Sequence, residues 1–143
     1  MKYPALIIPL LGTILALGGC KDDMMGGRHG MMHSGNPPQE YRQLNNPLPL
    51  TEKHLKAGEE LYTSNCFACH GITGNGDGPA GVALDPAPAN LRQTLWMPMK
   101  NDAYLNWRIA EGGKLFDSAM PAFKQSMSVT QRWQLIHYLK ERL

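Results

Sequence analysis

Apolar side chains recur every three or four residues along much of the chain after Thr51, which is the spacing of amphipathic helices. Three segments carry the pattern clearly, and the predicted helices cover residues 51–66, 101–111 and 128–143. Thr51 and Ser128 favour helix N-caps, and Gln131 completes a capping box with Ser128. No segment alternates apolar and polar residues with a period of two. The pattern predicts an all-α domain of about three to five helices over residues 51–143.

A continuous apolar run lies near the N-terminus, from Leu6 to Leu17, after the single positive charge of Lys2. Its length suits a secretory signal peptide, and it is shorter than the run of about 20 apolar residues that a membrane-spanning helix needs. The following Leu17-Gly18-Gly19-Cys20 resembles the lipidation site of bacterial lipoproteins. We therefore expect residues 1–19 to be a lipoprotein signal peptide and Cys20 to carry lipid. An ordinary signal peptide with an incidental cysteine is the alternative.

Residues 20–50 contain few groups that could build a core, and glycine, proline and asparagine are frequent among them. We expect this segment to be a flexible tether, stiffened by proline in its second half. It contains four methionines and two histidines with copper-binding chemistry, namely Met24, Met25, His29, Met31, Met32 and His33. The alternative is a linker in which these residues are incidental.

Length and net charge bear on the number of domains and on the class of partner. Removal of 19 residues from 143 leaves 124, enough for one domain. A formal net charge of +2 is too small to indicate nucleic acid as a partner.

Cys66-Phe67-Ala68-Cys69-His70 follows directly on the first predicted helix. C-x-x-C-H is the attachment pattern for c-type haem, in which both cysteines bond to the porphyrin and the histidine is an axial ligand of iron. A zinc ribbon needs a second pair of ligands, and Cys20 is the only other cysteine in the sequence. A thioredoxin-like redox pair needs a βαβ context, which the pattern does not predict.

Two loops after this motif bear on the chemistry. Gly76-x-Gly78-x-x-Gly81 matches a dinucleotide-binding fingerprint in form, but no predicted strand precedes it. The proline-rich loop 85–91 has a restricted shape suited to hold the second ring nitrogen of His70 through a backbone carbonyl. We expect this carbonyl to belong to Pro86 or Pro88.

A sixth iron ligand must come from methionine or histidine, the usual partners of an axial histidine. Met120, followed by Pro121, lies in a loop between the second and third predicted helices, where it can fold across the haem. It is the expected ligand, together with His70. The other candidates are Met97 and Met99 in an irregular stretch, Met127, and His54 and His137 on predicted helices.

Together, the first helix ending in C-x-x-C-H, the Met120-Pro121 loop and the aromatic-rich last helix resemble a class I monohaem c-type cytochrome, of the kind that is lipid-anchored in bacteria. The resemblance implies one covalent haem c held by Cys66, Cys69, His70 and Met120. It implies that the first and last helices cross at Gly58 and Tyr62, against the face that carries Trp133, Ile136 and Tyr138. By analogy, the Leu91 region and Trp107 would line the haem.

The function implied is an electron carrier and not an enzyme, tethered to the membrane on the periplasmic side of the bacterial cell envelope. Its partners would be a respiratory donor and a terminal oxidase or reductase. The alternatives are a copper-handling or haem-sensor lipoprotein and a small haem peroxidase-like enzyme.

Overall fold

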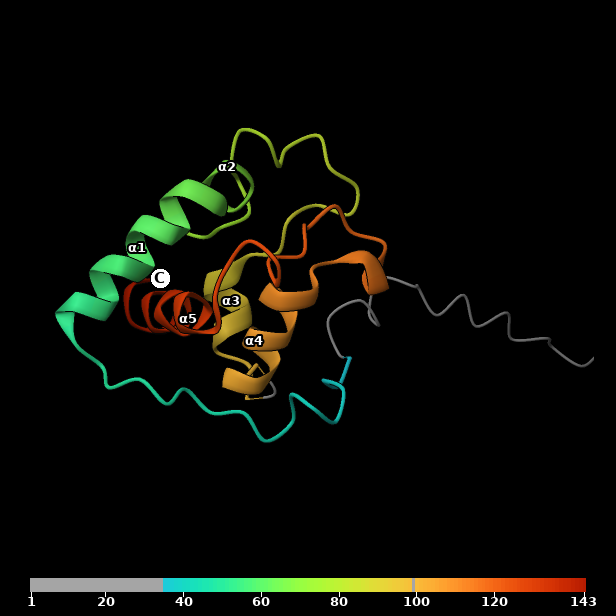
Figure 1. The fold of residues 1–143 in the computed structure, drawn as a ribbon. Coiled ribbons are helices and arrows are strands. Elements are labelled where there is room, and N and C mark those ends of the chain that lie inside the picture. The colour runs from blue at the N-terminus through green and yellow to red at the C-terminus, as the bar shows by residue number, and fades with distance from the viewer. Residues whose placement is uncertain (1–34, 99) are drawn as a thin grey trace, which may run out of the picture.

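The computed structural model describes residues 35–98 and 100–143. Its elements are α1 (Glu52–Asn65), α2 (Phe67–His70), α3 (Leu91–Leu95), α4 (Asp102–Glu111), the 3₁₀ helix η2 (Lys114–Phe116) and α5 (Val129–Arg142). Within these residues there is no strand, so the predicted all-α fold is confirmed (Figure 1). No helix in the same part of the chain is both long and apolar enough to cross a membrane.

The helix boundaries follow from local capping. The side chain of Thr51 accepts a hydrogen bond from His54 N at the start of α1, as the sequence predicts. Ser128 and Gln131 form the predicted capping box of α5, with Gln131 N donating to Ser128 Oγ at 3.2 Å. Asn101 caps α4 in the same way by accepting from Tyr104 N.

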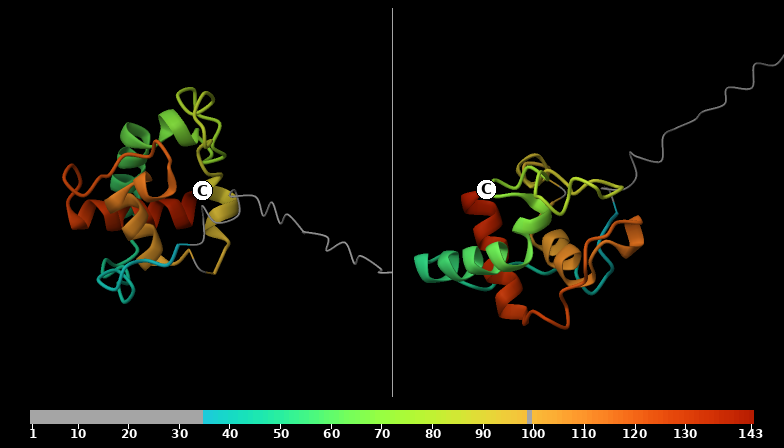
Figure 2. Two further views of the ribbon diagram at one scale, coloured as in Figure 1. Left: turned by 90° about the vertical axis from the view of Figure 1, so that its right-hand side faces the viewer. Right: turned by 90° about the horizontal axis from the view of Figure 1, so that it is seen from above.

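The first and last long helices cross closely, as Figure 2 shows from above. Gly58 lies at the crossing, where an added Cβ would meet the backbone carbonyl of Gln134 and approach Tyr138 Cβ to 2.7 Å. One turn further along α1, the rings of Tyr62 and Tyr138 pack with their centroids 5.4 Å apart. The absence of a side chain at Gly58 therefore allows the contact that brings α1 onto α5.

Helix α4 packs on α5 and completes the core. Its residues Tyr104, Leu105, Trp107, Ile109 and Ala110 are all buried. The core continues through Trp133, Leu135, Ile136 and Leu139 of α5. The ends of α1 and α4 are thereby fixed relative to each other, which positions the loops described below.

Residues 41–48 differ from the flexible tether expected up to residue 50, because they pack against the helices. Tyr41 is 7% exposed and its hydroxyl donates to Glu111. Asn46 N donates to Asp102 Oδ2 at 2.9 Å, and the Asn46 side-chain amide donates to Trp133 O at 2.9 Å. We call residues 41–48 the strap. These contacts hold the strap against the helices. The partner residues lie 56 to 87 residues away in the sequence, so no local sequence pattern predicts the contacts.

Candidate functional site

The C-x-x-C-H residues form the bend between α1 and α2. Helix α1 ends at Asn65, and Cys66 N still donates to Tyr62 O at 2.8 Å. His70 N donates to Cys66 O at 2.9 Å, which closes the single turn of α2. Both cysteines and His70 consequently line one pocket.

This pocket has about 800 Å³ of space that no atom fills, part of it open to solvent. Its wall comes from the C-x-x-C-H bend, the loop 84–89 and the stretch 116–123, and consists of Asn65, Cys66, Cys69, His70, Leu84, Pro86, Ala87, Pro88, Ala89, Arg108, Phe116, Ser118, Ala119, Met120, Pro121 and Phe123. A mostly apolar cavity with two thiols, an imidazole and a thioether fits a haem c group in its donor set.

His70 is oriented by the proline-rich loop. Its Nδ1 lies 3.1 Å from the carbonyl oxygen of Ala89, so Nδ1–H donates and Nε2 is left available to a metal. Burial lowers the pKa of His70, and the hydrogen bond to Ala89 acts in the opposite direction. A neutral imidazole is the form that binds a metal.

The sequence predicted that the carbonyl of Pro86 or Pro88 would accept the hydrogen bond from His70. This prediction is wrong for the residue, although the loop is the predicted one. The carbonyl of Pro88 faces Gly76, where an added Cβ would meet it. The next carbonyl along the chain, that of Ala89, is the one directed at the imidazole. Successive carbonyls of an extended segment point in different directions, so the sequence identified the loop and missed the residue.

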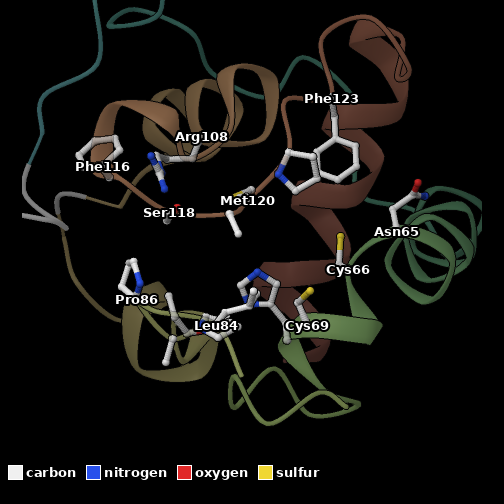
Figure 3. A pocket seen from close by; sticks show the side chains of 16 residues that line it. Asn65, Cys66, Cys69, Leu84, Pro86, Arg108, Phe116, Ser118, Met120 and Phe123 are labelled. Atoms are coloured by element: carbon white, nitrogen blue, oxygen red, sulfur yellow. Dashed lines mark hydrogen bonds between the residues drawn. The ribbon is translucent and has the colours of Figure 1, made fainter. Parts of the chain in front are cut away.

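Met120 lines the same pocket as His70, and Figure 3 shows its side chain pointing into the cavity. The loop that carries it is fastened at the end of α4, where Gly113 N donates to Met120 O at 2.8 Å. Gly112 has φ +69°, and an added Cβ would lie 2.7 Å from Met120 O. Only glycine fits such a position without strain.

The other candidates for a sixth ligand lie elsewhere. Met97 is 43% exposed, and Met127 is 3% exposed within the core. His54 and His137 are hydrogen-bonded to backbone carbonyls instead. His54 Nδ1 lies 2.9 Å from Pro49 O, and His137 Nε2 lies 2.9 Å from Leu48 O. None of these four lines the pocket. Met99 lies outside the described residues.

Trp107 and Leu91 do not line this pocket, although Pro88 and Ala89, just before Leu91, do. Trp107 is 4% exposed and packs edge-on against Tyr104 and Phe116, with centroid separations of 5.8 and 5.6 Å. The α4 residue that lines the pocket is its neighbour Arg108. The signal that could have found it is that Arg108 is the only charged residue between the ends of α4 at Asp102 and Glu111, since a charge on a mostly buried helix needs a partner.

Cys66 does not resemble the reactive cysteine of a redox-active pair. Burial raises the pKa of the Cys66 thiol to about 12, with a further contribution from Cys69. A reactive thiol needs a pKa below the usual value. The described residues hold no group of three or more His, Cys, Asp or Glu side chains arranged for a metal ion. Cys20 and the candidate copper ligands Met24, Met25, His29, Met31, Met32 and His33 lie outside the described residues.

Comparison with known proteins agrees with this geometry. Residues 53–139 match the family model described as cytochrome c oxidase, cbb3-type, subunit III. Among solved structures, a chain of the reducing HAO-like protein complex of Kuenenia stuttgartiensis is similar, with a TM-score of 0.53 and 29% sequence identity. The similarity covers 67% of this chain and 47% of that one, so this chain spans about half of its relative. No curated protein sequence matches.

Proposed function

The chain belongs to the family described as cytochrome c oxidase, cbb3-type, subunit III, and on this premise we propose that it is a membrane-tethered electron carrier of the bacterial cell envelope. It is a monohaem c-type cytochrome with one covalently bound haem c. Electron transfer by this cofactor follows from the family. The axial ligands, the tether and the respiratory role are our proposals.

Four side chains of the pocket would hold the cofactor. Cys66 and Cys69 would form the thioether bonds, and His70 Nε2 would bind iron, since Nδ1 is engaged with Ala89. Met120 would supply the second protein ligand of the iron. When bound, haem c supplies one-electron transfer between ferric and ferrous iron.

The observation that carries the proposal is that Met120 lies in the same cavity as His70 and is fixed there by the Gly112-Gly113 turn. With His70 and Met120 both bound, the iron would have no open coordination position for oxygen or peroxide. This favours a carrier over the peroxidase-like alternative. Thioether ligation and an apolar wall also favour the ferrous state and raise the reduction potential.

The cellular setting is inferred from sequence. The export signal and Cys20 support a lipid anchor, and covalent haem attachment through C-x-x-C-H takes place outside the bacterial cytoplasm. A respiratory donor and a terminal oxidase or reductase are the proposed partners. The family description names an oxidase, and the structural relative belongs to a protein complex, which supports partner proteins in general. Such encounters use small, transient interfaces.

Carbon monoxide binding to the reduced holoprotein tests the carrier against an enzyme or sensor. We expect no rapid binding to the wild type, rapid binding to Met120→Ala, and wild-type behaviour in the control Met97→Ala, whose side chain lies outside the pocket. Rapid binding to the wild type would show an open iron position and would reject the carrier in favour of the peroxidase-like or sensor alternatives.

A further inference from the structure

An exposed apolar segment follows directly on α3. Trp96, the C-cap of α3, is 89% exposed, and Met97 after it is 43% exposed. Pro98 is exposed as well. Arg92 lies one helical turn before Trp96, is exposed, and forms no ion pair with any other described residue. We call residues 96–98 the α3 ridge.

The α3 ridge is not part of the haem pocket, because none of its residues lines that pocket. A redox partner has to dock beside the cofactor, since electron transfer slows steeply with distance, so the ridge is a poor site for such a partner. Its composition is that of a membrane-interface anchor instead. Tryptophan places its ring at the level of the lipid headgroups, and a neighbouring arginine favours anionic lipid.

The N-terminal chain joins the domain before the strap begins. Gly35 lies against η2 and α4, because an added Cβ would be 2.8 Å from Phe116 Cζ and 3.3 Å from Trp107 Cη2. The chain therefore contacts the helices from Gly35 on, well before the end of the expected tether at residue 50.

This early attachment limits how far the domain can lie from a lipid on Cys20. Cys20 and Gly35 are 15 residues apart (35 − 20). A fully extended chain spans about 3.5 Å per residue, so these residues reach about 50 Å at most. Figure 2 shows that the described chain begins on the same side of the molecule as α3, so the ridge and the point of attachment can face one bilayer. Within this reach, docking on the bilayer is an intramolecular event that a small patch can achieve.

We propose that the α3 ridge docks on the lipid bilayer that carries the Cys20 anchor, with the Trp96 ring among the headgroups, and that this second contact fixes the tilt of the haem plane to the membrane. The inference rests on the lipid anchor of the proposed function. An anchor at one point lets a domain rotate, whereas two contacts restrict its orientation. Because Cys66 and Cys69 bond the haem to the domain, the haem plane turns with it and its absorption reports that orientation.

The test is polarised absorption of the Soret band of the lipidated holoprotein in a supported bilayer of phosphatidylethanolamine and phosphatidylglycerol. Trp96→Ser removes the ring of the ridge. The control Val129→Ser removes another exposed apolar side chain, at the start of α5. It lies away from the ridge, because the opposite end of α5, at Leu143, is the one that meets Leu91 of α3 beside Gly74. We expect a dichroic ratio that shows an ordered haem in the wild type and the control, and the random value in Trp96→Ser.

A dichroic ratio in Trp96→Ser equal to that of the wild type, whether ordered or random, would overturn the proposal. The same result is expected if the ridge binds a protein partner instead of lipid. Retention of the protein on the washed bilayer reports the anchor separately. A wild type that washes off would overturn the lipid anchor and this inference together, whereas retained protein with unchanged dichroism would overturn this inference alone.

Discussion

Gly58→Ala tests whether the close crossing of α1 and α5 is a real constraint on this fold. The new Cβ would meet the Gln134 carbonyl oxygen and come within 2.7 Å of Tyr138 Cβ and 2.9 Å of the Gln134 carbonyl carbon. These are backbone atoms and a Cβ, which cannot rotate away as the end of a flexible side chain could. The helices must therefore separate or the backbone must shift.

Two opposing effects set the magnitude. Alanine in a helix interior is about 1 kcal/mol more favourable than glycine. Overpacking costs about 1–3 kcal/mol, and the rigid neighbours of Gly58 place it near the upper end. The expected result is a net loss of about 2 kcal/mol in the free energy of unfolding. For a domain of this size that corresponds to a fall of about 8–16 °C in Tm.

The assay is thermal unfolding of the holoprotein, followed by far-ultraviolet circular dichroism. Lys56→Ala is the matched control, because Lys56 is an exposed residue of the same helix and gains little from the change. A Gly58→Ala protein as stable as the control, or more stable, would refute the reasoning, since helix propensity would then outweigh any steric conflict at the crossing.

Three further predictions follow from other parts of the chain. Tyr62→Phe should lose about 1–2 kcal/mol of stability, because the buried Tyr62 hydroxyl donates to Gly71 O at 2.6 Å beside the C-x-x-C-H bend; denaturation identical to the wild type would contradict this. Removal of haem should leave residues 51–143 without a cooperative thermal transition, because about ninety residues build a limited core around the cofactor; a native-like transition in the apoprotein would argue against it. Replacing residues 24–33 with a glycine-serine linker of equal length should leave the electron-transfer rate of the carrier unchanged. A slower rate in this variant, together with a rate that depends on copper in the wild type alone, would favour the copper-handling alternative.

The sequence correctly predicted the features that depend on residues close to one another along the chain. The caps at Thr51 and Ser128 are local, because each side chain accepts a hydrogen bond from the backbone N–H three residues ahead. Met120 was identified by its proline neighbour and its place in a loop, and the structure brings it into the pocket with His70. These features need no knowledge of how the helices pack.

The features that were missed depend on contacts between distant segments. The strap is ordered by Tyr41 and Asn46 through partners on α4 and α5, and nothing in residues 41–48 marks them as packed. Whether Trp107 or its neighbour Arg108 lines the pocket depends on the rotation of α4, since one residue turns a helix by about 100°. A repeating apolar pattern in α4 that covers nearly its whole circumference cannot fix that rotation.

Axial ligation of the haem iron in the purified holoprotein tests the central claim most directly. We predict that the oxidised wild type shows the absorption of sulfur-to-iron charge transfer, that Met120→Ala loses it, and that Met97→Ala keeps it. Unchanged axial ligation in Met120→Ala would contradict the assignment of His70 and Met120 as the two ligands, and with it the closed iron site on which the carrier function rests.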